Sequence, residues 1–498
     1  MKNIRKQANI MRYIQIVSRS LPELRPTFAS LSNVSKKHIF STSQFTGGGG
    51  MKKLFVFLCV IGLIAASASP LFAGGIDNKT AWSAEYIRTF NRNAATDSAD
   101  IVMYNPAGTT KMEDGFYGNL SVLYVAKDYS NNINGTEFDQ DEPSYIPGLF
   151  LLYKKDRLAG FFGLSNVLGG GKVKFEDGDA TSSAIGLGLI TKANLGLAGA
   201  GVPADFFYTG INNQYLEGEH TGLGYTFGGA FKINDMFSVS LAAMYVDTHK
   251  EGKGNVTIHA ANPAPSPPFP VGLNDDATGS VDYEEDADGW GGVIGLNISP
   301  TDQWNIGIRY NTKVSLDYDQ TVNVDSIYFS NGVKYGDNLI LPELGITNGG
   351  ERTRDLPAIL ALGVSYKLND KIRLEADLTY YFNEDVDWMG LEDSLDNGYD
   401  LGLALEYTFN PKFKGSIGYA HTDTGIDAKD MLPEAPELNA DTIAGGVAYE
   451  CIPGLTLNLG IGNSFYESDS FVSSTTGNTI EYEKNNFFIA LGAQYKFF

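Results

Sequence analysis

Few residues in this chain combine the side-chain types and the spacing that covalent chemistry requires. The sequence holds no nucleophile motif, no phosphate-binding glycine loop, and no serine, histidine and aspartate set with the spacing of a catalytic triad. The five histidines are scattered and have no metal-ligand spacing; they are His38, His220, His249, His259 and His421. We therefore expect no enzyme, no cofactor and no bound metal.

The residues with binding chemistry are cations and apolar side chains. Arg309, Lys313 and Arg373 lie in the polar phase of segments whose polarity alternates, so they are candidate partners for a carboxylate on a ligand. The alternative is a structural ion pair with an acid of the same region, such as Glu375 or Asp377, and this is the commoner role of such cations.

An apolar stretch runs from Ser182 to Gly210 inside an otherwise polar region. An exposed loop this apolar is costly in water unless it packs or binds something. One interpretation is a groove that captures a hydrophobic ligand, and the other is a small loop core in which the same side chains pack against each other. The residues concerned are Ile185, Leu187, Leu189, Leu195, Leu197, Phe206 and Phe207.

The elements that would position these residues are indicated by a two-residue period. From Trp304 to Tyr318 the apolar side chains share one phase, which includes Val314, and the polar phase contains Gly307 and Arg309. Residues 372–382 alternate in the same way. Successive side chains of a strand point to opposite faces, so each of these strands has an apolar face and a polar face.

Fourteen such runs are present, and the connections between them are alternately short and long. The short ones consist of turn residues such as Asn-Asp and Pro-Gly. The runs cover residues 115–128, 144–155, 157–175, 216–232, 236–250, 281–299, 302–319, 353–367, 370–384, 397–409, 412–423, 438–451, 454–468 and 481–498.

This arrangement predicts an all-β fold, a fourteen-stranded antiparallel transmembrane β-barrel of the outer-membrane type over residues 115–498. Closure would satisfy every backbone group where lipid offers no hydrogen bonds. A secreted β-sandwich or propeller is the alternative, but its strands would be shorter and its apolar faces would not end in aromatic residues.

The start of the chain has the features of a targeting signal. Residues 51–73 comprise two lysines, an apolar run and small residues, the layout of a secretory signal peptide. Residues 1–50 end in four glycines directly before Met51, and we interpret them as an upstream extension that is not native; a genuine basic leader is the alternative. The rest of the chain carries 27 basic and 58 acidic residues, a net charge of −31, which argues against nucleic acid as a partner.

Residues 74–114 precede the first strand and lack its alternation. They end in an Asn-Pro-Ala-Gly turn, Asn105, Pro106, Ala107 and Gly108. Proline fixes φ and lacks an N–H, and asparagine can bond its own backbone, so the pair favours a rigid turn. The segment is long enough to fold back into a barrel lumen as a hatch, although a simple loop turn would also explain the motif.

A hatch-sized segment that ends in this turn ahead of fourteen strands resembles the outer-membrane transporters of long-chain fatty acids and aromatic hydrocarbons (the FadL/TodX type). Asp288 to Val314 and Leu356 to Leu368 also resemble regions of that family. The resemblance implies passive uptake of a hydrophobic small molecule across the outer membrane of a Gram-negative bacterium. It covers residues 74–498, and Asn311 departs from the family pattern, which often has arginine there.

The resemblance also implies a lateral exit. In the family a kink in the third strand opens the wall sideways, and in this chain Ser165, Asn166, Gly169 and Gly170 would suit such a kink. The alternative is that the glycines simply begin the following loop. The C-terminal strand, ending in Phe497 and Phe498, resembles the signal read by barrel-assembly machinery. Two alternative functions are a general porin for polar solutes and a surface adhesin. The acidic loops of such an adhesin would bind partners, or cations that bridge lipopolysaccharide.

Overall fold

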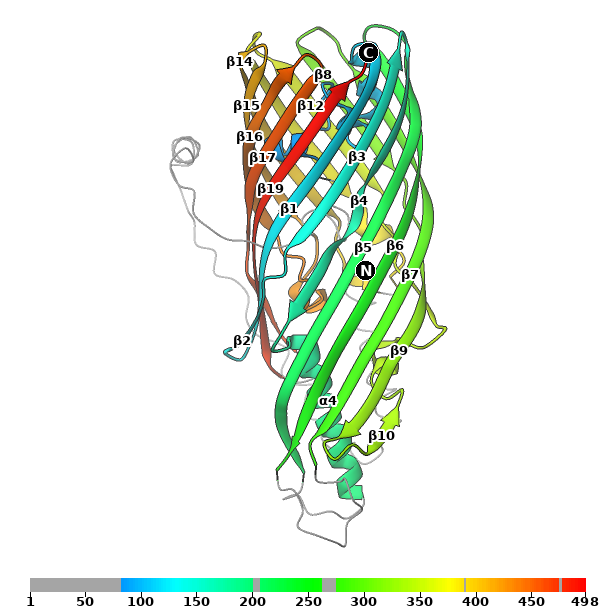
Figure 1. Ribbon diagram of the computed structural model, residues 1–498, viewed down its shortest axis with the longest axis vertical. Helices are drawn as coiled ribbons and strands as arrows, with labels where there is room; N and C mark the ends of the chain where they lie inside the picture. Colours follow the sequence, from blue (N-terminus) through cyan, green and yellow to red (C-terminus); the bar gives the residue numbers. More distant parts are fainter. Residues whose placement is uncertain (1–81, 200–206, 262–274, 389–390, 474–476) are drawn as a thin grey trace, which may run out of the picture. The chain divides into compact units, whose positions relative to one another are not determined.

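Antiparallel strands paired edge to edge make up most of the described residues of the protein in the computed structural model (Figure 1). The structure describes residues 82–199, 207–261, 275–388, 391–473 and 477–498. The expected extension 1–50, the expected signal peptide 51–73 and the first eight residues of the expected hatch lie outside these ranges. None of the described helices is both long and apolar enough to cross a membrane.

Nineteen strands are assigned in the described residues, and the strands that cover the predicted runs 115–128, 216–232, 236–250 and 281–299 are longer than those runs. They are β1 Gly115–Ile133, β2 Thr136–Gln140, β3 Ser144–Lys155, β4 Leu158–Phe175, β5 Tyr208–Lys232, β6 Phe237–Ala260, β7 Ala277–Ile298, β8 Trp304–Asn311, β9 Asp317–Phe329, β10 Lys334–Asp337, β11 Glu351–Thr353, β12 Ile359–Lys367, β13 Ile372–Tyr381, β14 Gly398–Asn410, β15 Phe413–Asp423, β16 Ala440–Ile452, β17 Leu455–Tyr466, β18 Asp469–Val472 and β19 Thr479–Lys496.

The sheet closes on itself because the first strand pairs with the last. The β1–β19 ladder runs from Tyr117↔Lys496 to Ile133↔Ile480, and β1 pairs with β3 on its other edge. β8 and β9 occupy one position in the wall, because both pair with β7. β11 and β12 occupy the next position, because β11 pairs with β9 and β12 with β8. With the hairpin strands β2, β10 and β18 set aside, the wall has fourteen positions, and the predicted fourteen-stranded barrel is confirmed.

The outer surface of the wall is apolar in the way that a membrane requires. Leu120 and Leu241 are 61% and 68% exposed, although they lie in the middle of paired strands. Aromatic side chains meet on the strands at both ends of this apolar region, as in the contacts of Tyr245 with Trp290 and of Trp304 with Tyr366. An apolar band between aromatic girdles is typical of transmembrane barrels.

The predicted run 302–319 is wrong as a single strand. The chain leaves the wall between β8 and β9, where Thr312 donates its N–H to Gly292, and Val314 instead pairs with Leu356. Val314 and Leu316 therefore point into the interior and are almost fully buried, while Trp304 on the same sequence phase faces outward. The run 353–367 is likewise divided, because β11 ends at Thr353 and β12 begins at Ile359.

Several long connections contain more structure than their polarity indicated. β6 and β7 extend to Ala260 and from Ala277, so most of the described part of the expected loop 251–280 is strand. The expected loop 176–215 contains a 20-residue helix, α4 Ala180–Gly199, at the end of the barrel opposite the C-terminus (Figure 1). Short 3-10 helices occupy other connections: η6 Leu341–Leu344, η7 Asn383–Asp385, η8 Leu391–Ser394 and η9 Ala428–Asp430.

Residues 82–114, here called the N-terminal segment, lie inside the ring of strands (Figure 1). They form the short helix α3 Ala84–Thr89 and the 3-10 helices η3 Ala99–Val102 and η4 Pro106–Lys111. α3 contacts β14 to β17, β19 and β1, and η4 contacts β3 to β8. Nearly all side chains of the segment are buried, so the segment fills the lumen against opposite walls.

Candidate functional site

The N-terminal segment lies against the wall where the strands carry glycine instead of a side chain. A Cβ atom at Gly418 would lie 1.7 Å from the carbonyl oxygen of Thr89, and one at Gly307 would lie 1.8 Å from that of Asn93. Four more of the inward glycines that contact the segment are Gly363, Gly402, Gly460 and Gly492, and these six lie on β8, β12, β14, β15, β17 and β19. We call these six positions the glycine track; they allow the segment's backbone to approach the sheet.

Polar side chains of the wall satisfy the backbone of the segment along the same track. Asp377 accepts hydrogen bonds from the backbone N–H groups of Arg92 and Asn93, both at 2.8 Å, and Glu375 accepts one from Ala94 at 3.1 Å. Gln494 accepts one from Ala99 at 2.6 Å. A buried irregular segment must find partners for its N–H groups, and here the barrel supplies them.

Buried charges add further ties between segment and wall. Arg92 is fully buried and pairs with Asp97 at 2.7 Å and with Asp100 at 2.6 Å, both within the segment. Arg88 reaches the wall and pairs with Glu406 at 3.0 Å. Removing one partner of such a pair would leave an uncompensated buried charge, which is strongly destabilising.

The Asn-Pro-Ala-Gly motif is buried at the junction between the segment and β7. The Asn105 side chain caps η4 by accepting a hydrogen bond from the Gly108 N–H, and Pro106 occupies the first turn. Asn105 Nδ2 also donates to Asn297 Oδ1 on β7 at 2.8 Å and to the Ala95 carbonyl at 3.0 Å. Ala107 is fully buried. The motif thus combines a local turn with a contact to the wall.

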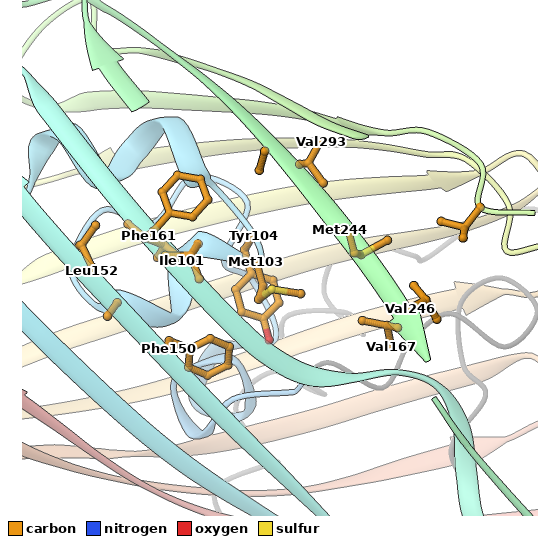
Figure 2. Close-up of a cluster of buried hydrophobic side chains, with 14 of the residues drawn as sticks. Ile101, Met103, Tyr104, Phe150, Leu152, Phe161, Val167, Met244, Val246 and Val293 are labelled. Atoms are coloured by element: carbon orange, nitrogen blue, oxygen red, sulfur yellow. The ribbon is translucent and has the colours of Figure 1, made fainter. Parts of the chain in front are cut away.

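A cavity of about 100 Å³ lies beside the segment in the lumen. Its lining is aromatic and aliphatic on the side of the segment, from Trp82, Tyr86, Phe90, Met103 and Tyr104. The wall contributes apolar side chains such as Val167, Met244, Val314 and Leu356, and polar ones that include Arg309, Asp377 and Asp400. Figure 2 shows Met103 and Tyr104 beside Val167 and Met244 in this buried cluster. A cavity with such a lining suits an apolar ligand.

The three cations that sequence analysis selected have different surroundings. Arg309 lines the luminal cavity, and its Nε has no hydrogen-bond partner among the described residues. Lys313 lies on the exposed face, opposite to the expected one, because the chain bends after Thr312, and its Nζ pairs with Asp355 at 2.5 Å. Arg309 is therefore the one of the three that faces the apolar cavity.

Arg373 forms structural ion pairs, which is the role that the alternative interpretation predicted. It pairs with Glu375 at 2.7 Å and with Glu406 at 3.5 Å on the wall, and it lies 3.9 Å from Asp97 of the N-terminal segment. Its charge is thus already compensated by three carboxylates.

The apolar stretch after β4 forms helix α4, which packs on the inner side of β5 and β6. Ile185, Leu189, Leu197 and Phe207 belong to one cluster with Val256 of β6 and with Ile340, the residue before η6, whereas Leu187 and Leu195 are exposed. Phe206 lies outside the described residues. These contacts resemble the loop core of the second interpretation, with an exposed apolar edge.

A second cavity, of about 130 Å³, lies between α4 and the wall. Thr181, Ser182 and Ile185 line it from the helix region, and Gly170 and Gly171 line it from β4. The two cavities therefore both touch β4, at Val167 and at Gly170.

The third wall strand is bent where its glycines cluster. Gly169 and Gly171 have φ of 75° and 76°, a region that residues with a Cβ rarely adopt, and the β4–β5 register shifts twice between Asn166 and Gly171. Ser165, Asn166 and the four residues after them are all buried, so the strand's alternation is lost. β4 pairs with β3 only up to Ser165.

One group of described residues has the geometry of a cation site. Glu251, Asp282 and Glu284 place one carboxylate oxygen each within 4.8 Å of the others. Lys253 contacts Glu251, and Asn323 donates to Asp282 at 3.2 Å and to Glu284 at 2.9 Å, so protein groups already compensate part of this charge.

Sequence reasoning missed the glycine track and the acids that bind the segment's backbone. A signal was present, because Gly307 occupies the polar, inward phase of its strand, and glycine inside a strand often marks a close backbone approach. The partners of that approach are more than 200 residues away in the sequence, so periodicity alone could not identify them.

Comparisons with known proteins agree with this architecture. The chain is similar to the crystal structure of a Pseudomonas aeruginosa FadL homologue, with 16% identity, a TM-score of 0.61, and coverage of 85% of this chain and 100% of that one. It is also similar to the Ralstonia pickettii toluene transporter TbuX, at 16% identity and a TM-score of 0.54, with 83% and 99% of the two chains covered.

The P. putida toluene transporter TodX is similar at 14% identity, with a TM-score of 0.54 and coverage of 81% of this chain and 96% of that one. No curated protein sequence matches the chain. A sequence model of the outer membrane protein transport protein family (OMPP1/FadL/TodX) matches residues 64–497, which is most of the chain. The protein is thus an outer-membrane β-barrel of a Gram-negative type and belongs to the OMPP1/FadL/TodX family of transport proteins for hydrophobic compounds.

Proposed function

We propose that this protein takes up long-chain fatty acids or aromatic hydrocarbons by passive transport, through a barrel whose lumen residues 74–114 close as a hatch. The observation that carries the proposal is the luminal cavity, which has aromatic walls on the N-terminal segment and Arg309 at its edge. A porin needs an open polar lumen, whereas this lumen is filled by buried side chains of the segment.

The cavity also bears on the choice of cargo. Trp82, Tyr86 and Phe90 would receive either an acyl chain or an aromatic ring. Arg309 adds a cation whose Nε lacks a partner among the described residues, and a ligand carboxylate would supply one, although Asp377 and Asp400 line the same cavity. This favours an acid with a long apolar tail. The toluene transporters with a similar fold keep an aromatic hydrocarbon as the second candidate.

We propose further that cargo leaves sideways, between β3 and β4. The two strands stop pairing at Ser165, and both cavities reach β4 next to this point. α4 and its exposed residues Leu187 and Leu195 would collect cargo at the outer end of the barrel. The barrel-assembly machinery would recognise the C-terminal strand β19, and the acidic loops would face lipopolysaccharide.

An uptake comparison tests the function. Cells without a transporter of their own would be given this protein or its Arg309→Gln variant, and uptake of a labelled long-chain fatty acid and of an alkylbenzene would be measured. A hydrogen bond to a charged group contributes about 1.5–3 kcal/mol, so the variant should lose about tenfold or more of the fatty acid uptake and keep alkylbenzene uptake. Arg157→Gln, in the exposed β3–β4 turn, is the matched control.

Liposome swelling distinguishes the porin alternative. Proteoliposomes should not swell with sugars, because the segment closes the lumen. Swelling with sugars together with no uptake of either hydrophobic compound would contradict the proposal and favour a porin. Uptake of both compounds that Arg309→Gln leaves unchanged would contradict the role given to Arg309.

A further inference from the structure

The unpaired edge between β3 and β4 leaves backbone carbonyl groups that need partners. Beyond Ser165, β4 continues to Phe175 with ladder bonds to β5 alone, while the facing part of β3 pairs only with β1. Buried carbonyl groups without a partner are costly, so a stable break in a buried ladder requires substitute donors.

Three side chains donate to these carbonyl groups. Asn166 Nδ2 donates to the Gly169 carbonyl at 2.8 Å, and Ser144 Oγ, from the first residue of β3, donates to the Gly170 carbonyl at 2.7 Å. Lys127 Nζ on β1 donates to the carbonyl of Lys172 and lies 3.4 Å from that of Gly170. The donors thus come from β4 itself and from both strands on the far side of the break.

Lys127 is unusual among these donors because it is a cation inside the barrel. The residue is 2% exposed, and the oxygens that its Nζ contacts are backbone carbonyls. Burying an ammonium is costly, so its presence requires compensation by well-placed acceptors. The bent segment of β4 supplies them, because its carbonyl groups point away from β5 and toward β1.

We propose that Lys127, together with Ser144, is a positioning residue that holds residues 166–171 of β4 in their inward bend and so keeps the seam between β3 and β4 open for cargo. The proposal rests on the lateral exit of the proposed function. Without these donors, the bend of β4 loses its hydrogen bonds, and residues 166–169 can extend the β3–β4 ladder as far as Ser144, which closes the seam.

A disulfide across the seam measures its closure. Continuing the ladder beyond Gly148↔Ser165 would place Ile146 directly opposite Val167, and both side chains face inward. The pair Ile146→Cys and Val167→Cys, in a Cys451→Ser background, should cross-link slowly in the otherwise unchanged protein. Adding Lys127→Met should raise the rate of cross-linking about tenfold and lower fatty acid uptake by a similar factor.

Controls separate this role from general stability. Lys484→Met removes another buried lysine that lies over the ring of Tyr129, as Lys127 does, but Lys484 donates to the Pro436 carbonyl in a loop. It should leave cross-linking unchanged, and Lys127→Arg should restore the slow rate. If Lys127→Met does not give a folded barrel, Ser144→Ala removes the smaller donor and should raise cross-linking in the same direction.

The outcomes distinguish the two proposals. Equal cross-linking rates in folded barrels with and without the Lys127→Met and Ser144→Ala substitutions would overturn the positioning role. Full uptake by the fully cross-linked protein would overturn the lateral exit, and with it the significance of the seam for transport. Faster cross-linking and lower uptake with Lys127→Met, together with no uptake by the cross-linked protein, would support both.

Discussion

The glycine track gives a prediction whose size can be worked from the structure. Gly418→Ala would place a methyl group 1.7 Å from the Thr89 carbonyl oxygen, whereas ordinary contact begins at 3.4 Å. Neither Gly418 nor Gly307 has a positive φ, so an alanine fits the strand itself. The N-terminal segment must therefore move by about 1.7 Å, and overpacking of this kind costs about 1–3 kcal/mol. The barrel ladder should be unaffected.

The assay reads the position of the segment and the fold of the barrel separately. Ala95→Cys, in a Cys451→Ser background, places a thiol at a fully buried site of the segment. A membrane-impermeant maleimide should label it slowly. Labelling should be several-fold faster when Gly418→Ala and Gly307→Ala are added, and heat-modifiable gel mobility should show an intact barrel.

A glycine outside the glycine track serves as the control. Gly160→Ala, at a β4 glycine with no atom within 4 Å of its would-be Cβ, should change neither labelling nor mobility. Unchanged labelling in a folded Gly418→Ala, Gly307→Ala protein, together with unchanged leakage of sugars, would refute the reasoning, because the segment would then not depend on the glycines for its place.

Two further predictions concern the motif and the α4 region. Replacing Asn105 and Pro106 with Ala removes the hydrogen bond to Asn297 and the η4 cap, which should cost the docked N-terminal segment about 1–3 kcal/mol of stability while the barrel still folds. Sugar leakage should then rise or fatty acid uptake should fall. If leakage and uptake are both unchanged, the motif is a simple turn. Burial and the neighbouring Glu434 raise the pKa of Asp179, before α4, to about 7. Because this folded-state pKa is above the unfolded value, the contribution of Asp179 to the stability of the α4 region is complete below about pH 4 and is lost as pH rises to about 7. Proteolysis of α4 should therefore accelerate over that pH range. Asp179→Asn should abolish this pH dependence.

The barrel could be predicted from the sequence because a lipid-facing wall imposes a strict period of two. The terminal strand illustrates this: Leu491, predicted in the apolar phase, faces outward, and Phe488 and Ala490 on the other phase are buried. At residues 312–318 the same period led to a wrong prediction of which side chains face inward. Val314 and Leu316 alternate as a wall strand would, yet they face inward, because the chain bends after Thr312 and the alternation then continues in a different orientation.

The candidate site could be predicted only in part, since its chemistry depends on contacts between distant residues. Arg309, Lys313 and Arg373 are equivalent in sequence terms, each a cation in a polar phase. What separates them is the position of carboxylates: Asp355 lies beside Lys313, and three acids surround Arg373. No local pattern encodes these distances.

The contacts of the N-terminal segment bear on how cargo would pass it. Expelling the segment would break its bonds to Asp377 and Glu375 and the buried Arg88–Glu406 pair, and would expose the glycine track to the lumen all at once. Each unpaired buried charge alone costs several kcal/mol. A shift of the apolar side chains that line the cavity breaks none of these contacts, and the cavity already extends from the segment to Val167 at the bend of β4. The energetics therefore favour cargo moving beside the segment toward β4, with the segment remaining in the barrel.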